Sequence, residues 1–400
     1  MALAANLAVA RALAGPGVLV EPVVKADAYG HGMIPIAGAL VAAGADGLCV
    51  ATLDEAMALR DAGARGRITV LYPVPPVLAA EAARQGIGLA AGDPALLRAL
   101  LASLPTDGPA LNLELEIDTG LGRGGVPAEA ALDAARTIAA SPGARLAGVW
   151  THLQAAEDAA RTTAQIERFE AALTALAAAG IAVPRRHVAA SGGLLTGRIP
   201  RYDAVRPGLM TYGLLPVELE PASLVPGAEG LRPVMSIVAR PVRVIELPAG
   251  HGISYGPTFS TGRPSRIATL PLGYGDGWPR SLSNNAEALV RGTRVPLVGN
   301  VAMDACMFDV TDSPGEPITV DDEFVLMGVQ GTDRITAGDL ARARTTNSWE
   351  VVTGTSRRLP RVYDAPAGAV GTRTLTSGED HWLGSNSGMV TSVTSKSTRS

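Results

Sequence analysis

Residues 22–32 read PVVKADAYGHG and follow a short apolar run, Val18 to Val20. The β-branched residues of this segment predict a short buried strand that ends at Lys25. Removing a lysine from water is costly and shifts its pKa readily, which suits an amine that reacts with the carbonyl group of a cofactor. A lysine at a strand end is also often a solvated cap or an ion-pair partner, so the rest of the chain has to decide between the two interpretations.

Short apolar runs alternate with Ala- and Leu-rich stretches over residues 1–215. We expect strands at 18–25, 46–52, 67–72, 87–91, 111–117, 145–151, 186–190 and 204–210. We expect helices in the alanine-rich N-terminus and at 34–43, 53–63, 77–85, 94–104, 128–140, 162–179 and 193–198. Eight strands with seven crossovers predict an α/β fold, a (β/α)8 TIM barrel. The alternative is an open doubly wound sheet, but no Gly-rich dinucleotide turn follows the first strand.

A barrel of this kind carries its active site at the C-terminal ends of its strands, and phosphate is often bound after strands seven and eight. In the predicted order, Lys25 ends strand one and His152 ends strand six. Ser191 follows strand seven, and residues 206–208 lie in strand eight. The polar residues therefore collect on the face where a barrel enzyme works.

The pattern changes at residues 214–233, which carry four prolines and two glycines and are typical of a domain connection. Strand-like runs follow, separated by Gly/Pro turns, at 234–247, 266–271, 288–298 and 324–328. We therefore expect a barrel domain over residues 1–220 and a mostly β C-terminal domain over 221–365. Residues 366–400, rich in Ser, Thr and Gly, are expected to form a disordered tail.

Composition excludes several classes of protein. The net charge of -4, without a basic cluster, argues against a nucleic-acid partner. Cys49 and Cys306 are the only cysteines and show neither metal-ligand spacing nor a disulfide framework, so a cytoplasmic protein without a metal site is expected. The N-terminus lacks a signal-peptide pattern, and no apolar window is long enough to predict a membrane span.

Residues 22–32 closely resemble the cofactor-lysine motif of alanine racemases, fold-type III enzymes that use pyridoxal 5′-phosphate (PLP). Segments similar to further motifs of this family follow in order: 117–123 (IDTGLGR), 151–153 (THL), 205–208 (VRPG), 253–256 (ISYG), 272–277 (LGYGDG), 301–304 (VAMD) and 358–363 (RLPRVY). The resemblance thus extends from residue 22 to residue 363. It implies the same barrel and β domain that the pattern of the chain predicts.

The resemblance also implies roles for single residues. Lys25 would carry PLP and act as one of two acid–base groups, on the face from which the D-enantiomer loses its α-proton. Tyr255 would be the second base, contacted by His152, which Arg206 would hold in turn. Arg206 would face the pyridine nitrogen of PLP, and a guanidinium cannot surrender a proton to it. Without the family, a tyrosine in a Gly-rich turn and an Arg-Pro-Gly sequence are more typical of structural turns.

The same resemblance supplies ligands for the cofactor and the substrate. The phosphate-binding positions correspond to Tyr29, Ser191, the backbone amides of Gly208 and Leu209, and Tyr363. Hydroxyls and amides suit a dianion without needing a cation. The substrate carboxylate would be bound by Arg123 and the amide of Met303, while Tyr274 and Tyr363 would narrow the entrance and favour a side chain as small as methyl. Asp304 would orient the Met303 loop.

Racemisation needs acid–base groups on both faces of one carbon, and a lysine fixed to the cofactor covers only one face. In the family the second group comes from the partner subunit. The resemblance therefore implies a head-to-tail homodimer in which Tyr255 and Met303 complete the partner's site, with an amino acid as the small-molecule substrate.

Some positions depart from the family pattern. Glu116 stands where many relatives carry a carbamylated lysine, and we predict that it forms an ion pair with Arg123. Alternatively, Glu116 is only one of the charged residues that alternate along an exposed strand. Ala190 replaces an Asn that usually precedes Ser191. The leading strand of the family, which joins the β domain, is expected to be missing, which would leave an unpaired strand edge.

The hypothesis with most support is a PLP-dependent alanine racemase that supplies D-alanine for peptidoglycan. A racemase for serine or a broader set of small amino acids remains open, because the pocket lining decides it. A fold-type III decarboxylase shares the barrel and the lysine, but such enzymes usually pair the pyridine nitrogen with an acid and use a cysteine opposite the lysine; Arg206 and Tyr255 argue against it. A non-catalytic PLP-binding protein is the fourth possibility.

Overall fold

The chain forms two compact units. A computed structural model describes residues 2–216, 218–219, 221–364, 370–373, 380–382 and 392–394. The first unit comprises residues 3–28 and 33–231, and we call it the barrel unit. The second comprises Ala2, residues 29–32 and the described residues from Arg232 onward, and we call it the β unit. The predicted disorder of residues 366–400 stays a prediction, because most of that stretch lies outside the described residues.

Eight parallel strands form the barrel, as predicted, and they are joined in the order β1-β9-β8-β7-β5-β4-β3-β2. A parallel bridge between Val23 and Cys49 connects the two ends of this order and brings the sheet close to a full ring. The strands are β1 (Leu19–Val20), β2 (Gly47–Val50), β3 (Arg67–Val70), β4 (Ile87–Ala91), β5 (Leu111–Asp118), β7 (Ala144–Trp150), β8 (Arg186–Ala190) and β9 (Ala204–Arg206). A short strand, β6 (Val126–Pro127), pairs with the end of β5.

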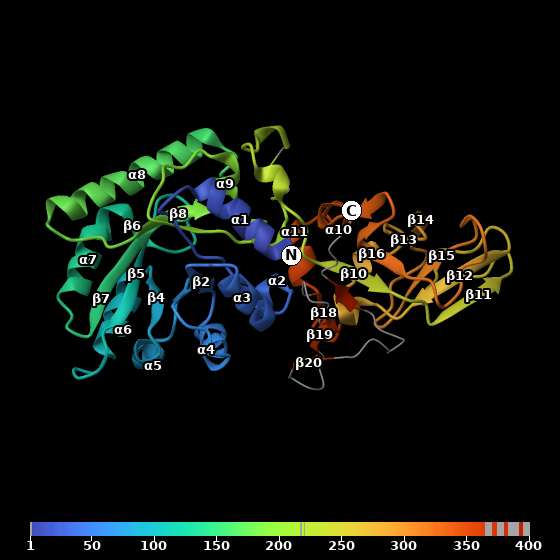
Figure 1. The fold of residues 1–400 in the computed structure, drawn as a ribbon, viewed down its shortest axis with the longest axis horizontal. Coiled ribbons are helices and arrows are strands. Elements are labelled where there is room, and N and C mark those ends of the chain that lie inside the picture. Colours follow the sequence, from blue (N-terminus) through green and yellow to red (C-terminus); the bar gives the residue numbers. More distant parts are fainter. Residues whose placement is uncertain are drawn as a thin grey trace. The chain divides into compact units, whose positions relative to one another are not determined.

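Helices cover the outside of the ring (Figure 1), which is why strands such as β4 are buried along their whole length. The helices are α1 (Ala2–Ala14), α2 (Lys25–Tyr29), α3 (Met33–Ala42), α4 (Leu53–Asp61), α5 (Ala79–Arg84), α6 (Pro94–Ala102), α7 (Ala131–Ala139), α8 (Ala159–Ala178) and α9 (Ser191–Thr196). Short 3-10 turns include η1 (Pro76–Leu78), η2 (Ala128–Ala130) and η3 (Leu209–Tyr212). Local sequence sets several starts: Thr52 and Glu55 form a capping box at α4, and Asp93 caps α6 just before Pro94.

The first strand is shorter than predicted and ends in an unusual turn. Beyond Val20 only the Val23 bridge continues the pairing, and Lys25 opens α2, which winds in the left-handed sense: residues 26–29 have φ between +52° and +55°. Such a conformation costs non-glycine residues about 1–2 kcal/mol each. Asp27 Oδ1 accepts a hydrogen bond from Met33 N at 2.8 Å, which helps to hold the turn. Strain of this size at a strand end is typical of a functional site.

A chain of buried charges crosses the interior of the barrel unit. Arg67 Nη1 lies 3.1 Å from Glu21 Oε1, and Arg185 pairs with Glu21 and, at 2.5 Å, with Glu114. Glu114 Oε2 lies 3.2 Å from His187 Nε2. Although burial opposes it, the hydrogen bond with His187 and the charge of Arg185 lower the pKa of Glu114 to about 2. Glu114 thus stays ionised inside the barrel, because its hydrogen bond with His187 and the charge of Arg185 outweigh the effect of burial.

The β unit contains two sheets. The larger follows the order β14-β13-β16-β10-β21-β18-β19-β20, with β17 paired to β16, and the smaller follows β11-β12-β15. The strands are β10 (Ser236–Ala239), β11 (Arg243–Leu247), β12 (Ser265–Leu270), β13 (Glu287–Val290), β14 (Thr293–Pro296), β15 (Cys306–Asp309), β16 (Phe324–Gln330), β17 (Asp333–Ile335), β18 (Arg361–Asp364), β19 (Val370–Arg373), β20 (Asp380–Trp382) and β21 (Ser392–Thr394). The predicted mostly β character is confirmed.

Two details of the β unit differ from the prediction. The run 234–247 is split between two sheets, since Pro241 cannot donate a ladder hydrogen bond and separates β10 from β11. The unit also holds two unpredicted helices, α10 (Ala337–Arg344) and α11 (Ser348–Thr353), each started by a side-chain cap from Thr336 or Asn347. The 3-10 turns η4 (Pro221–Ser223), η5 (Ala228–Gly230), η6 (Tyr274–Asp276) and η7 (Arg280–Leu282) complete the elements.

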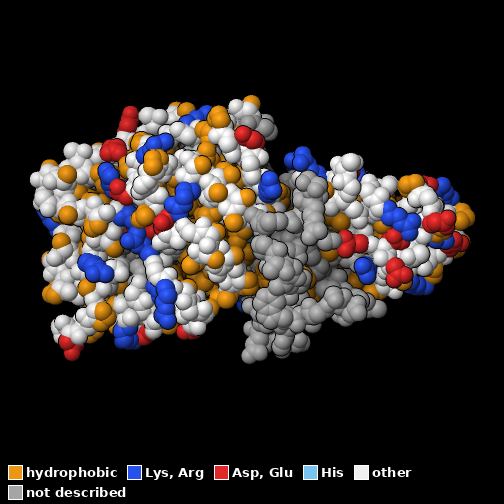
Figure 2. Space-filling view, viewed as in Figure 1, with side chains coloured by type: hydrophobic (Ala, Val, Ile, Leu, Met, Phe, Trp, Pro, Cys, Tyr) orange, Lys and Arg blue, Asp and Glu red, His pale blue; other side chains and the backbone are white. Residues whose placement is uncertain are grey.

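Surface charges of the two signs are interspersed on the face shown in Figure 2. Several belong to exposed ion pairs of the β unit, such as Arg263 with Asp312 and Arg266 with Glu246. Pairs of this kind contribute little to stability, because water screens them.

The buried charges make a testable prediction for stability. Arg185→Ala leaves the carboxylates of Glu21 and Glu114 buried without their shared cation, so we expect the free energy of unfolding to fall by about 3–5 kcal/mol. Arg67 pairs with the same carboxylate of Glu21, but its side chain is 44% exposed. We therefore expect Arg67→Ala to lower the free energy of unfolding by less than about 1 kcal/mol. Denaturant unfolding followed by circular dichroism measures both, and equal losses would contradict the proposed role of burial.

Candidate active site

Lys25 and Arg123 both lie over one aromatic ring in the barrel unit. Lys25 Nζ is 5.6 Å and Arg123 Cζ 5.4 Å from the centroid of Tyr72, which follows β3. Burial, and then the charge of Arg123, lower the pKa of Lys25, while Glu55 opposes the shift. A larger share of this amine is therefore neutral than for a lysine in water, and only the neutral form can act as a nucleophile or base.

The loop that carries Arg123 is held by Asp118 at the end of β5. Asp118 Oδ1 accepts hydrogen bonds from the amides of residues 120 and 121 at 2.9 Å and of residue 122 at 3.2 Å. Glu116 Oε1 lies 3.8 Å from Arg123 Nη2, so the predicted ion pair is confirmed. Burial raises the pKa of Glu116, although Arg123 and Arg206 act in the opposite direction.

Arg206 ends β9 and is fully buried. Its Nη1 contacts His187 Nδ1 and donates to the carbonyl of His187 at 3.0 Å, and Nη2 donates to the carbonyls of Thr151 and Val188 at 3.0 and 3.3 Å. Its guanidinium stacks over Trp150, with Cζ 4.7 Å from the ring centroid. Burial lowers its pKa to about 10, so the group stays protonated at neutral pH.

His152 follows β7 and interacts with Arg206 differently from what the resemblance implied. Within the described part of the chain, the hydrogen bonds of the guanidinium reach His187 and backbone carbonyls and not the His152 ring. Burial and the charges of Arg206, Arg123 and Lys25 lower the pKa of His152 to about 3. The ring is thus kept neutral by burial first and by the neighbouring positive charges second.

Ser191, Gly208 and Leu209 come together at the ends of β8 and β9. Ser191 Oγ accepts hydrogen bonds from the amides of Gly208 and Met210 at 2.9 and 3.2 Å, and Leu209 begins η3. Gly208 lies just beyond β9, since the strand ends at Arg206 instead of continuing to residue 210 as predicted. A buried hydroxyl beside helix-starting amides is a suitable environment for an anion.

The other two predicted phosphate ligands belong to the β unit. Tyr29 O accepts a hydrogen bond from His31 Nδ1 at 3.0 Å, and Tyr363 Oη donates to His31 O at 2.9 Å. The buried side chain of Arg361 donates to Gly30 O from Nε and Nη2 at 3.2 and 2.9 Å. Gly30 is required here, because a Cβ atom would lie 2.2 Å from the carbonyl oxygen of Val352.

Tyr274 and Met303 lie beside each other in the β unit. The amide of Tyr274 donates to Ala302 O at 3.0 Å, and the amide of Gly275 donates to Met303 O at 2.9 Å. Asp304, expected to orient this loop, accepts a hydrogen bond from Arg358 Nη2 at 2.7 Å. The loop is thus fixed from both sides.

Three large side chains from the family motifs are exposed on the β unit. Tyr255 is 79%, Met303 53% and Tyr274 44% exposed. Exposed aromatic and Met side chains are typical of surfaces that contact a partner.

The residues present fit a PLP molecule. A lysine with a lowered pKa supplies the amine, and Ser191 with the amides of η3 suits the phosphate dianion. Arg206 donates hydrogen bonds from Nη1 and Nη2 and keeps its proton, so it suits the side of an unprotonated ring nitrogen. No group of His, Cys, Asp or Glu in the described ranges could hold a metal ion.

Comparison with known proteins decides the family. The model of the alanine racemase N-terminal domain matches residues 1–216, and that of the alanine racemase C-terminal domain matches residues 234–363. The chain belongs to the alanine racemase family. It is 43% identical over 344 residues to an alanine racemase of Symbiobacterium thermophilum, covering 85% of this chain and 89% of the relative. An alanine racemase of Syntrophobacter fumaroxidans is 41% identical over 357 residues, covering 88% and 92%.

Solved alanine racemase structures share the fold of the chain. The enzyme from Bacillus anthracis with bound L-Ala-P matches with a TM-score of 0.84 and 30% identity, covering 96% of this chain and 95% of that one. The enzyme from Streptomyces coelicolor matches with a TM-score of 0.80 and 35% identity, covering 89% and 94%. None of the helices in the described part of the chain is long and apolar enough to cross a membrane.

Sequence motifs of the racemase family did not reveal every residue of the site. Tyr72, Glu55 and His187 lie outside the motifs that carried the resemblance, yet they contact Lys25, support its loop or hold Arg206. Glu55 Oε1 accepts a hydrogen bond from Ala26 N at 2.6 Å while also serving in the capping box of α4. The capping box at residues 52–55 (Thr-Leu-Asp-Glu) can be recognised in the sequence, but the hydrogen bond that Glu55 accepts from Ala26 N cannot.

The neutral state of His152 can be measured directly. An unperturbed histidine titrates with a pKa near 6.5, whereas His152 should stay neutral down to pH of about 3. NMR of protein labelled at the histidine rings should therefore show one signal, absent in His152→Asn, that does not shift between pH 8 and pH 5. Titration of that signal near pH 6.5 would contradict the proposed effect of burial and of the neighbouring cations. Since the folded-state pKa is the lower one, the neutral ring also contributes stability above pH 6.5 that is lost toward pH 3.

Proposed function

We propose that this chain catalyses the PLP-dependent racemisation of L- and D-alanine by two bases. The observation that carries the proposal is the arrangement around Tyr72, where an amine with a lowered pKa and a guanidinium both lie close to one ring, at 5.6 and 5.4 Å from its centroid. An α-amino acid presents an amine and a carboxylate one carbon apart, which matches a reactive lysine beside an arginine. The relatives named alanine racemase support the choice of substrate.

The barrel unit would bind and orient both small molecules. When bound, PLP supplies the electron-withdrawing ring that makes the α-proton of the amino acid acidic. Ser191 and the η3 amides would hold its phosphate. Arg206 would face the ring nitrogen, and because it keeps its proton at neutral pH, it would leave that nitrogen unprotonated.

Lys25 would move the proton on one face of the α-carbon. Its lowered pKa favours the neutral amine, which takes the α-proton from D-alanine. Arg123 would bind the carboxylate, oriented by Glu116 at 3.8 Å and by the Asp118-held loop. The neutral His152 can accept or donate a hydrogen bond without adding a fourth charge to this group of cations.

Tyr255 would move the proton on the opposite face, and we infer that it does so in the site of a second copy of the chain. The exposure of Tyr255, Met303 and Tyr274 supports a head-to-tail homodimer, because burying these side chains against a partner removes apolar surface from water. In such a dimer the amide of Met303 would bind the substrate carboxylate, and Tyr274 would narrow the entrance.

The product D-alanine would serve peptidoglycan synthesis, and the cytoplasm is the proposed compartment, since Cys49 and Cys306 are both free and buried. A racemase for serine or other small amino acids differs only in the side chain that the entrance accepts, so serine belongs in the same assays.

Exchange of the α-hydrogen in D2O tests the two-base proposal. Lys25→Ala should lose the visible absorption of lysine-bound PLP and all exchange. Tyr255→Phe should keep PLP, lower racemisation in both directions by about 10²- to 10⁴-fold, and slow the exchange of L-alanine far more than that of D-alanine. Full exchange of L-alanine in Tyr255→Phe would remove Tyr255 from its role, and retained PLP absorption in Lys25→Ala would remove Lys25.

The ion pair of Glu116 makes a separate prediction. Glu116→Gln keeps the shape of the side chain but removes the charge beside Arg123, so we expect KM for alanine to rise about 5- to 30-fold, which corresponds to a loss of about 1–2 kcal/mol. Glu129→Gln changes an exposed carboxylate of the same unit and serves as the control. An unchanged KM in Glu116→Gln would show that the carboxylate is only a structural charge.

A further inference from the structure

Tyr255 lies on a loop whose own packing does not fix the position of the Tyr255 side chain. Residues 250–261 fold back on themselves through the bridge between Gly252 and Ser260 and a 3.0 Å hydrogen bond from Ile253 N to Phe259 O. The Tyr255 side chain is mostly exposed, and Ser254 before it has φ of +67°, an unfavourable conformation for a residue other than glycine. Contacts from outside the loop must therefore fix the direction of Tyr255.

Asn300 provides these contacts. Its side chain is buried, and Nδ2 donates to the carbonyl oxygens of Tyr255 and Gly256 at 2.9 and 3.0 Å. Its Oδ1 accepts from Thr258 Oγ1 at 3.3 Å, and its backbone oxygen accepts from Ser254 Oγ at 2.6 Å. One residue thus binds four consecutive or nearly consecutive positions of the loop, on both sides of the tyrosine.

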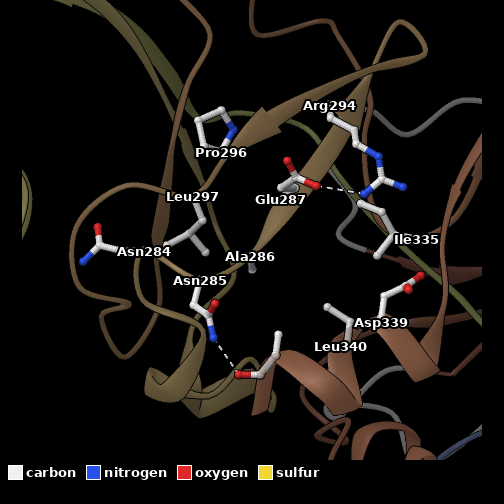
Figure 3. A pocket seen from close by; sticks show the side chains of 11 residues that line it. Asn284, Asn285, Ala286, Glu287, Arg294, Pro296, Leu297, Ile335, Asp339 and Leu340 are labelled. Atoms are coloured by element: carbon white, nitrogen blue, oxygen red, sulfur yellow. Dashed lines mark hydrogen bonds and ion pairs between the residues drawn. The ribbon is translucent and has the colours of Figure 1, made fainter. Parts of the chain in front are cut away.

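A second asparagine supports the first. Asn284 Nδ2 donates to Thr258 Oγ1 at 2.9 Å, and Asn284 Oδ1 accepts from Gly299 N at 2.6 Å. Asn284 also lines a surface pocket of the β unit, where Figure 3 shows it next to Asn285. Asn285 points to a different partner, the carbonyl of Ala343 at 2.7 Å, and does not contact the loop.

We propose that Asn300 is a positioning residue that holds the Tyr255 loop in the geometry needed for proton transfer on the second face of the substrate. The proposal rests on the role assigned to Tyr255 under the proposed function. Proton transfer requires the phenol oxygen within hydrogen-bond reach of the α-carbon's proton, and a misplacement of about 1 Å can slow a reaction by about 10²-fold. Asn300 lies three residues before Met303, so the same segment couples the base to the amide proposed for the carboxylate.

The test is Asn300→Asp in the full-length holoenzyme. Asp has the shape of Asn but, ionised, cannot donate to the two carbonyl groups, so the loop loses its hold without a cavity. We expect racemisation to fall by about 10- to 100-fold in both directions, because the equilibrium between the enantiomers cannot change. Exchange of the α-hydrogen of L-alanine in D2O should fall by the same factor, while that of D-alanine, served by Lys25, should stay within about 3-fold.

Three further variants make each outcome informative. Asn285→Asp alters the neighbouring amide and should leave both exchange rates within about 2-fold. Thr258→Val removes the hydroxyl between Asn284 and Asn300 without changing shape, and it should reproduce the loss for L-alanine more weakly, even if Asn300→Asp does not fold. Tyr255→Phe, measured in parallel, separates this inference from the proposed function.

Two results would overturn the inference. Exchange of L- and D-alanine falling equally in both loop variants would indicate general damage to the protein. The second is that Asn300→Asp and Thr258→Val leave the α-hydrogen exchange of L-alanine unchanged while Tyr255→Phe abolishes it. This result would show that Asn300 does not position the base. If Tyr255→Phe itself keeps the exchange of L-alanine, the role of Tyr255 fails first.

Discussion

The barrel unit depends on one electrostatic constraint: several cations are brought close together where its strands end. Burial and then the charge of Arg123 lower the pKa of Lys25, and burial together with the charges of Arg206, Arg123 and Lys25 lowers the pKa of His152 to about 3. Such a concentration of positive charge disfavours protonation of any further group and attracts phosphate and carboxylate. The site can therefore hold two anions and still keep an amine available as a base.

The carboxylates inside the barrel make this concentration possible. Glu114 and Glu21 both pair with Arg185, and Glu114 is linked through the neutral His187 to Arg206. Because His187 Nδ1 faces a guanidinium, which can only donate, its proton belongs on Nε2 and points to Glu114. The buried arginine is thus fixed by a neutral acceptor and by carbonyl groups, none of which can take its proton.

Repetition of strand and helix made the barrel predictable, since each buried parallel strand is an apolar run with its own turn signals. The course of the chain after Lys25 could not be predicted, because no local preference favours four left-handed residues in the sequence Ala-Asp-Ala-Tyr. The surrounding contacts impose that conformation. The same holds for α10 and α11, short helices whose stability comes from caps and packing more than from periodicity.

Motifs supplied the proposed cofactor and substrate ligands, and the family position of Glu116 was enough to predict its ion pair with Arg123. The supporting residues could not be found in this way. Tyr72, His187 and Asn300 act through contacts with residues distant in sequence, and an isolated Tyr, His or Asn is compatible with any surface or core position. Long-range contacts of this kind become visible only in three dimensions.

The central claim is that an active site joins Lys25 of one subunit to Tyr255 of another. Mixing two inactive variants, Lys25→Ala and Tyr255→Phe, and letting their subunits exchange tests it most directly. A mixed dimer of the proposed kind contains one site with both bases intact, so free exchange should restore about a quarter of the normal activity. A mixture that remains as inactive as its components would contradict the shared site.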